Sequence, residues 1–236
     1  MICLALIFIK CAKEDNFIII APDIDIDVPG PTRDSSFRGI KYLALGDSYT
    51  IGQSVPVQER FPVQLGKKLE INGFDIDTID IIAMTGWTTD ELIQGINNRN
   101  DFDSVYQLVS LLIGVNNQYR GYPITTYDQE FTELLNKAIA FAGGKRERVF
   151  VVSIPDYAYT PFGNGNSAIS NGIDQYNAVN NTISNNFGVA YFDITPISRD
   201  GLADLSLVAP DGLHPSGYQY SLWIELMLED LLKMLN

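Results

Sequence analysis

The chain of 236 residues contains one histidine, His214, which follows Asp211 by three positions in the string Pro-Asp-Gly-Leu-His-Pro. Near the other end, Ser48 follows Gly-Asp directly after the apolar run 42–45. A serine, an imidazole and a carboxylate can act as nucleophile, general base and orienting group in a nucleophilic hydrolase. Because the chain has no other imidazole, a Ser-His mechanism must use His214.

Each of these residues also has a simpler interpretation. Ser48 lies between an expected strand and an expected helix, where serine is a favoured N-cap. Asp211 could cap a surface turn. The position of Ser48 nevertheless places it where backbone N–H groups of a helix start can stabilise an oxyanion. A Gly-containing turn bounded by prolines can fold the Asp211 carboxylate back onto His214.

Two further segments offer donors for the oxyanion of a tetrahedral intermediate. Asn116 has a side-chain amide just beyond an apolar run, and Gly86 has a backbone N–H with no side chain to block a substrate. Such donors contribute roughly 3–4 kcal/mol each in known cases. Taken singly, both signals are weak, because glycines and asparagines in loops are usually structural.

The elements that must position these residues alternate along the chain. Apolar, β-rich runs occupy 41–46, 76–83, 106–114, 147–154 and 189–193, and segments with helical spacing occupy 61–71, 88–97, 127–142, 170–186 and 216–235. This alternation predicts an α/β fold with a parallel sheet covered on both faces. Ligands bind at the carboxyl ends of such strands. Ser48, Gly86 and Asn116 all follow expected strand ends, so we expect them to converge on one edge.

Together these segments resemble the SGNH hydrolase superfamily, also called the GDSL lipase/esterase family. Its Gly-Asp-Ser turn, glycine donor, Gly-x-Asn donor and Asp-x-x-His pair occur here in order between residues 41 and 220. The resemblance implies a flavodoxin-like three-layer α/β/α sandwich with a five-stranded parallel sheet. It also implies a Ser48 nucleophile, His214 as base and acid, Asp211 orienting His214, and an oxyanion hole of Ser48, Gly86 and Asn116.

Two positions depart from the pattern of the family. Tyr49 stands where the family has leucine, and Asn117 stands where Asp frequently follows the oxyanion asparagine. We expect the second change to affect local hydrogen bonding more than catalysis. The other serine-hydrolase arrangement, the Gly-x-Ser-x-Gly elbow of α/β-hydrolases, does not fit because Thr50 occupies its last position.

Composition excludes several other classes of function. The 16 basic and 29 acidic residues give a net charge of −13, which opposes binding to nucleic acid. The two cysteines, Cys3 and Cys11, both precede residue 12, so the rest of the chain has no disulfide, thiolate nucleophile or cysteine zinc site. Any metal would have to be a hard cation on oxygen ligands, and the serine-hydrolase hypothesis itself requires neither a metal nor a cofactor.

The domain organisation predicted from sequence has three parts. Residues 1–12 resemble a signal or lipoprotein segment with Cys11 as a possible lipid anchor, although Lys10 replaces the small residue expected before it. Residues 13–38 are interpreted as a linker or extended arm, and 39–236 as the hydrolase domain. The protein is accordingly expected to be exported: periplasmic, anchored at the cell surface or secreted. Asp23, Asp25 and Asp27 mimic the start of a calcium loop, but a strand or linker is the better interpretation.

The sequence leaves the substrate open. Trp87, Tyr157, Tyr159 and Phe162 lie in segments that should flank the site, where aromatic faces could hold a sugar ring or an acyl chain, or simply pack. Short-chain esters, carbohydrate O-acetyl esters and lysophospholipids all fit a monomeric serine ester hydrolase. The alternatives are an O-acyltransferase with the same triad and a non-catalytic carbohydrate-binding surface protein.

Overall fold

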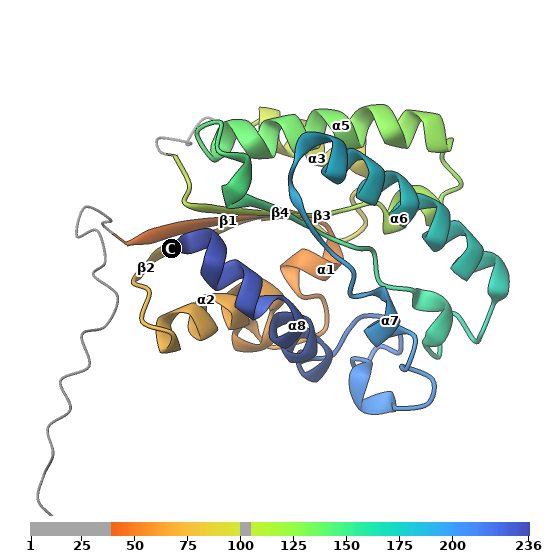
Figure 1. Ribbon diagram of the computed structural model, residues 1–236. Coiled ribbons are helices and arrows are strands. Elements are labelled where there is room, and N and C mark those ends of the chain that lie inside the picture. The colour runs from red at the N-terminus through yellow and green to blue at the C-terminus, as the bar shows by residue number, and fades with distance from the viewer. Residues whose placement is uncertain (1–38, 100–104) are drawn as a thin grey trace, which may run out of the picture. The chain divides into compact units, whose positions relative to one another are not determined.

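The computed structural model describes residues 39–99 and 105–236, and in them strands and helices alternate as the sequence predicts (Figure 1). The five strands in these residues form one parallel sheet of order β2-β1-β3-β4-β5. They are β1 (Ile40–Gly46), β2 (Ile76–Ala83), β3 (Leu108–Leu112), β4 (Val149–Val152) and β5 (Ala190–Phe192). The predicted α/β class and five-stranded parallel sheet are therefore confirmed. The strands β3, β4 and β5 are shorter than expected.

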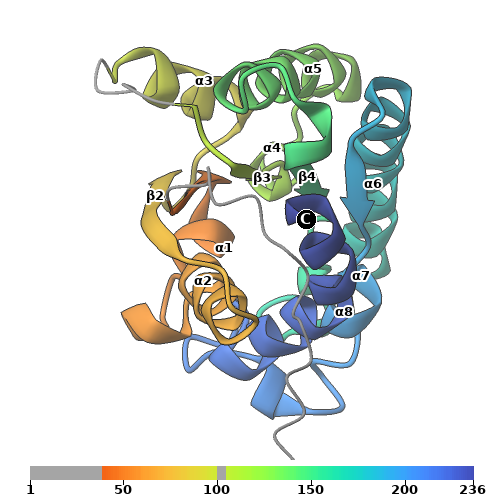
Figure 2. The ribbon, with the colours of Figure 1, turned by 60° about the vertical axis from the view of Figure 1, so that its left-hand side comes forward.

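Helices cover both faces of this sheet. Figures 1 and 2 show α3, α5 and α6 on one face and α1, α2 and α8 on the other. The longer helices are α2 (Phe61–Ile71), α3 (Thr89–Asn97), α5 (Ile124–Phe141), α6 (Ser167–Phe187) and α8 (Gly217–Leu235); the short ones are α1 (Ser48–Ile51), α4 (Val115–Tyr119) and α7 (Thr195–Ser198). Single 3-10 turns lie at 57–59, 146–148, 157–159 and 205–207.

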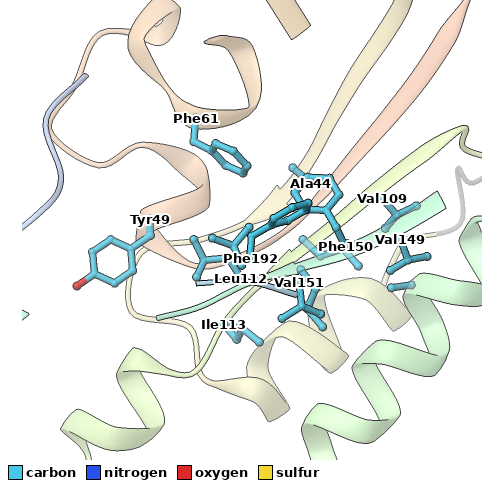
Figure 3. Packing of buried hydrophobic residues seen from close by; sticks show 14 of the residues in the cluster. Ala44, Tyr49, Phe61, Val109, Leu112, Ile113, Val149, Phe150, Val151 and Phe192 are labelled. Atoms are coloured by element: carbon cyan, nitrogen blue, oxygen red, sulfur yellow. The ribbon is translucent and has the colours of Figure 1, made fainter. Parts of the chain in front are cut away.

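The core lies between the sheet and these two helical layers, and Figure 3 shows part of it. Every residue of β3 and β4 is buried, as expected for parallel strands covered on both faces. Tyr42 stacks on Phe150 within the sheet, with ring centroids 6.4 Å apart. Phe61 of α2 meets Trp223 of α8 edge-on at 6.1 Å. Burying a large apolar side chain contributes about 1.5–3 kcal/mol, so these layers are held mainly by this packing.

Local sequence signals account for the limits of several helices. Thr88 and Glu91 form a capping box at the start of α3, where the Glu91 carboxylate accepts from Thr88 N–H at 2.9 Å. Pro62 lies in the first turn of α2, where its missing N–H costs nothing. The helix α6 ends at Gly188, whose φ of 66° is the left-handed conformation that favours glycine.

The strand ends that carry the site lie at the same level. Gly46 at the end of β1 is paired with Ala83 of β2 on one side and Leu112 of β3 on the other. The order reverses between β1 and β3, which is the topological switch point where α/β sheets bind ligands. A Cβ atom on Gly46 would lie 2.1 Å from the Thr50 hydroxyl oxygen, so only glycine lets the chain turn directly into α1.

Several sequence predictions concern residues outside the described ones. They are the signal or lipoprotein segment 1–12 with Cys11, the arm 13–38, and the acidic positions Asp23, Asp25 and Asp27. Within 39–99 and 105–236, no helix combines the length and the apolar character that a membrane crossing requires.

Candidate active site

Asp211 and His214 form a hydrogen-bonded pair. The distance from His214 Nδ1 to Asp211 Oδ2 is 2.6 Å, and the backbone N–H of His214 donates to Asp211 Oδ1 at 3.0 Å. The turn is tight because Gly212 has a φ of 73° and Ala209 N–H donates to the His214 carbonyl at 2.7 Å. The loop therefore folds the carboxylate onto the imidazole, in the arrangement that orients a catalytic histidine.

The electrostatics of Asp211 keep it ionised. Burial acts to raise the pKa of this carboxyl group, but hydrogen bonds from the Ser54 hydroxyl and from the backbone and ring of His214 outweigh it and hold the pKa well below its usual range. The carboxylate is thus negative throughout the neutral range, where it can stabilise a protonated His214.

Ser48 is the first residue of α1, and Asp47 rather than Ser48 caps this helix. The carboxylate of Asp47 accepts from Tyr49 N–H at 3.0 Å. The interpretation of Ser48 as an N-cap is therefore wrong, because its neighbour fills that role. Among the described residues, the Ser48 hydroxyl makes no hydrogen bond, so it is free of a structural task.

His214 lies beside the turn that carries Ser48. Its ring meets the ring of Tyr49 edge-on, with centroids 5.7 Å apart. The structure brings His214 close to the segment of Ser48 but forms no hydrogen bond between the two side chains. Catalytic hydrogen bonds often tighten only when substrate binds.

Asp47 has an unusual environment that the sequence did not reveal. Its side chain is fully buried, and its second oxygen, Oδ2, has no hydrogen-bond partner in the described part of the chain. Burial raises the pKa of Asp47 to about 7, although the hydrogen bond from Tyr49 N–H opposes the shift. A fraction of this carboxyl group is therefore protonated at neutral pH.

Three N–H donors face the carboxyl edge of the sheet. Gly86 has a φ of 86°, and neither its N–H nor that of Ser48 donates a hydrogen bond within the described residues. The Asn116 amide donates to the Trp87 carbonyl at 2.9 Å, which uses one of its two hydrogens. Each segment therefore retains one donor for a developing oxyanion, and the Asn116–Trp87 bond joins two of these segments.

A second tie between the same two segments comes from Arg120, which sequence reasoning missed. Its Nη2 donates to the Gly86 carbonyl at 2.7 Å, and its Nη1 lies 3.3 Å from Glu91 Oε1. Glu91 belongs to the capping box of α3, so the guanidinium connects the end of α4 to the loop that precedes α3. The carbonyl of Gly86 is thereby fixed.

Asn117 stands where the family that the motifs resemble frequently has aspartate. It is fully buried, accepts from Thr89 N–H at 3.1 Å and donates to the Thr89 hydroxyl at 2.6 Å. That hydroxyl donates in turn to the carboxylate of Glu130. A carboxylate is thus part of the network, supplied by α5 and not by α4.

The helix α1, which begins with Ser48, is also held by α8. Tyr220 of α8 donates its hydroxyl proton to the Tyr49 carbonyl at 2.9 Å in a fully buried contact. The C-terminal helix therefore fixes the residue that directly follows Ser48.

The aromatic residues expected near the site divide into two groups. Trp87 packs against α3, where a Cβ on Gly95 would lie 2.3 Å from its ring, so it has a structural role. Tyr157 and Phe162 instead form a cluster with Tyr119, with ring centroids 6.2–6.3 Å apart.

This aromatic cluster borders the loop of the Asp-His pair. Phe162 N–H donates to the Gly212 carbonyl at 3.0 Å, and Tyr119 lies three residues after Asn116. Tyr119 and Phe162 are 62% and 55% exposed, which leaves their faces open to a ligand, whereas Tyr157 supports them from below the surface. Tyr119 was not predicted from the sequence, because a tyrosine in a short helix carries no distinguishing signal.

No group of three or more His, Cys, Asp or Glu side chains in residues 39–99 and 105–236 could hold a metal ion.

Comparisons with known proteins concern the family and the fold. The sequence profile described as "GDSL-like Lipase/Acylhydrolase family" matches residues 44–222, and this confirms the resemblance stated from the motifs. No curated protein matches the chain significantly.

Similar solved structures include a lipase/acylhydrolase from Enterococcus faecalis, with 20% identity, a TM-score of 0.64 and coverage of 84% of this chain and 97% of that one. The esterase EstA from Pseudoalteromonas sp. has 18% identity, a TM-score of 0.62 and coverage of 84% and 99%. Axe2, an acetylxylan esterase from Geobacillus stearothermophilus, has 18% identity, a TM-score of 0.63 and coverage of 82% and 94%. At these identities the structures show a shared fold.

Proposed function

The chain belongs to the GDSL-like lipase/acylhydrolase family and is accordingly an esterase or acylhydrolase; we propose that it cleaves carboxylic esters through a covalent acyl-enzyme on Ser48, without a metal ion. The observation that carries this proposal is the 2.6 Å bond between Asp211 and His214 on the sheet edge that also presents Ser48. A free serine hydroxyl is a weak nucleophile, and this pair supplies the base that it needs.

In the proposed first step, Ser48 Oγ attacks the ester carbonyl carbon while His214 Nε2 takes the hydroxyl proton. The carbonyl electron pair moves onto oxygen, where the N–H groups of Ser48 and Gly86 and the Asn116 amide bind the negative charge. The intermediate collapses, the C–O bond to the alcohol breaks, and the imidazolium protonates the departing alcohol. Asp211 stabilises the imidazolium throughout.

In the second step, water repeats the attack on the acyl-enzyme. His214 removes a proton from water, the same donors hold the second oxyanion, and the ester bond to Ser48 breaks. The serine regains its proton, and the acid product leaves. Each turnover therefore consumes one ester and one water and requires no cofactor.

The substrate class that we propose is a short-chain acyl ester of a carbohydrate. The exposed faces of Tyr119 and Phe162 beside the site are suited to an apolar sugar face. The net charge of −13 disfavours anionic substrates and lipid surfaces. The acetylxylan esterase among the structural neighbours acts on an ester of this type. Lysophospholipids remain the second candidate class.

Two other functions compete with hydrolysis. An O-acyltransferase would form the same acyl-enzyme but pass the acyl group to a sugar hydroxyl, and product analysis with a polyol acceptor would detect the transferred ester. A non-catalytic carbohydrate-binding protein would need only the fold. The free hydroxyl of Ser48 and the free N–H of Gly86 favour an enzyme, because a protein without catalytic activity needs neither group.

The test is hydrolysis of p-nitrophenyl esters from acetate to palmitate by the wild type and by Ser48→Ala and His214→Ala. We expect activity on acetate and butyrate, falling by about 10⁴-fold in either variant, as for other triads. Circular dichroism would establish that both variants are folded. Near-wild-type turnover by folded Ser48→Ala would overturn the mechanism, and a preference for palmitate would overturn the short-chain assignment.

Export is a further proposal, and it rests on the sequence alone. The apolar run before Cys11 supports a processed N-terminus with a lipid on that cysteine. Mass spectrometry of protein from membrane and soluble fractions would test it, with Cys11→Ser as the control. An unprocessed chain of full mass in the soluble fraction would contradict the proposal.

A further inference from the structure

The side chain of Ser54 touches the acid of the Asp-His pair. Its hydroxyl donates to Asp211 Oδ2 at 2.6 Å, across 157 positions of sequence. This is the same oxygen that lies 2.6 Å from His214 Nδ1. Asp211 Oδ2 therefore receives one bond from the imidazole and one from the segment that follows the nucleophile helix.

Ser54 adopts a backbone conformation that serine usually avoids. Its φ is +65°, and only Asn164 shares such a value among the described residues other than glycine. The left-handed conformation costs a residue with a Cβ atom about 1–2 kcal/mol. Non-glycine residues held in this region cluster at functional sites, where the surrounding structure enforces them. Glycine would fit this turn without strain, but it has no hydroxyl to offer Asp211.

The residues that directly precede Ser54 fix its position. Gly52 ends α1 with a φ of 70°, and Gln53 N–H donates to the Ser48 carbonyl at 3.0 Å. The Gln53 side chain accepts from the Thr85 hydroxyl at 2.6 Å, which connects the turn to the loop of the glycine donor. Ser54 is thus held by the same turn that presents Ser48.

The Asp211 carboxylate needs such a partner because it is not enclosed. Its side chain is 29% exposed, so solvent reaches it. The backbone N–H groups of Leu213 and His214 bind only Oδ1. Ser54 is the described residue that holds Oδ2 besides the imidazole itself.

We propose that Ser54 is a positioning residue of the catalytic triad, which fixes the Asp211 carboxylate so that Oδ2 faces His214 Nδ1. This inference rests on the proposed Ser48–His214–Asp211 mechanism. When the hydroxyl is absent, the carboxylate rotates and binds water for part of the time. The imidazolium is then less stabilised, and His214 becomes a weaker base.

The experiment compares Ser54→Ala, Ser54→Gly and Ser206→Ala in p-nitrophenyl acetate hydrolysis from pH 4.5 to 9. Both Ser54 variants lack the hydroxyl, but only the alanine variant retains the backbone strain. Ser206 is the matched control, because its exposed hydroxyl also donates to an aspartate, Asp204, at 2.6 Å. Ser48→Ala is measured in the same series.

We expect both Ser54 variants to lose about 5- to 10-fold in kcat with little change in KM, and to move the acid limb of the kcat/KM profile to lower pH. Both effects follow from a weaker base, and a purely structural role would produce no shift of the limb. Ser206→Ala should match the wild type. The alanine and glycine variants should differ only in stability.

Three results would overturn the inference. Ser54 variants that behave like Ser206→Ala would show that the hydroxyl has no part in catalysis. An acid limb that moves to higher pH would show that the hydroxyl withdraws charge from the carboxylate instead of positioning it. An active Ser48→Ala would remove the mechanism and this inference together, whereas an inactive Ser48→Ala separates failure of the inference from failure of the mechanism.

Discussion

The tie between Arg120 and the Gly86 carbonyl leads to a specific prediction for the oxyanion hole. The change is Arg120→Met, which keeps the aliphatic length and removes the guanidinium. The variant loses the 2.7 Å bond to Gly86 and the 3.3 Å contact with Glu91. Gly86, whose N–H is one of the proposed oxyanion donors, is then held less firmly through its carbonyl group.

The expected loss of kcat depends on the hydrogen bonds that Arg120→Met keeps. Loss of a whole oxyanion donor lowers kcat by about 10²- to 10³-fold in known enzymes. In this variant the Asn116 amide still binds the Trp87 carbonyl at 2.9 Å, so Gly86 moves only in part. We therefore expect kcat to fall about 10-fold, which corresponds to about 1.4 kcal/mol. The Arg120 side chain is 39% exposed, so its contribution to folding should be no more than about 1 kcal/mol.

The assay is steady-state hydrolysis of p-nitrophenyl acetate, with kcat and KM determined separately. An effect confined to the transition state lowers kcat and kcat/KM together and leaves KM unchanged. Arg146→Met is the matched control, because Arg146 also donates to a backbone carbonyl, that of Phe187 at 3.0 Å, at an exposed position. Millimolar guanidinium ion should restore part of the activity of Arg120→Met. The reasoning is refuted if kcat of Arg120→Met lies within twofold of that of Arg146→Met.

Three further predictions concern stability. Asn117→Asp should lower the free energy of unfolding by about 2 kcal/mol at pH 8. The reason is that it buries a charge beside the Thr89 hydroxyl, which already donates to a carboxylate. An unchanged urea unfolding curve at pH 8 would disprove this prediction. Gly95→Ala should cost about 1–3 kcal/mol by forcing the Trp87 ring away, and thermal unfolding without a lowered Tm would contradict the packing argument. For Asp47, the folded pKa of about 7 lies above its usual value near 4, so the stabilisation that it provides is complete below about pH 4 and is lost as the pH rises through 7. Asp47→Asn should thus gain a few kcal/mol relative to the wild type between pH 4.5 and 8 in urea titrations, and a constant difference would refute the raised pKa.

Much of the fold was predictable because its signals are local. The helix α2 begins and ends where the spacing of apolar residues predicts, at 61–71, and α6 ends at a left-handed glycine. The helix α4 was not predicted, because five residues are too few for helical propensity to be decisive. Its residues Asn116 and Asn117 bond to Trp87 and to Thr89, the first residue of α3.

In the candidate site, too, contacts between residues close in sequence were predictable and contacts between distant residues were not. Asp211 and His214 are three residues apart, so a Pro- and Gly-containing turn was enough to predict their contact. Ser54 reaches Asp211 across 157 positions, and nothing in its sequence context indicates a left-handed serine. The role of Asp47 as the cap of α1 was also hidden, because serine and aspartate are both favoured caps and only the structure distinguishes them.

The contact between Tyr220 and the Tyr49 carbonyl has a consequence for biosynthesis. A ribosome makes α1 early and α8 after every other described element. The nascent chain therefore contains Ser48 long before Tyr220 can bond to the Tyr49 carbonyl. His214 also emerges late. A chain that ends before His214 lacks both the proposed base and the Tyr220 contact, and we expect no ester hydrolysis until α8 has packed against the domain. Recovery of ester hydrolysis during refolding should therefore report completion of the whole domain, whereas far-UV circular dichroism would report only its separate helices.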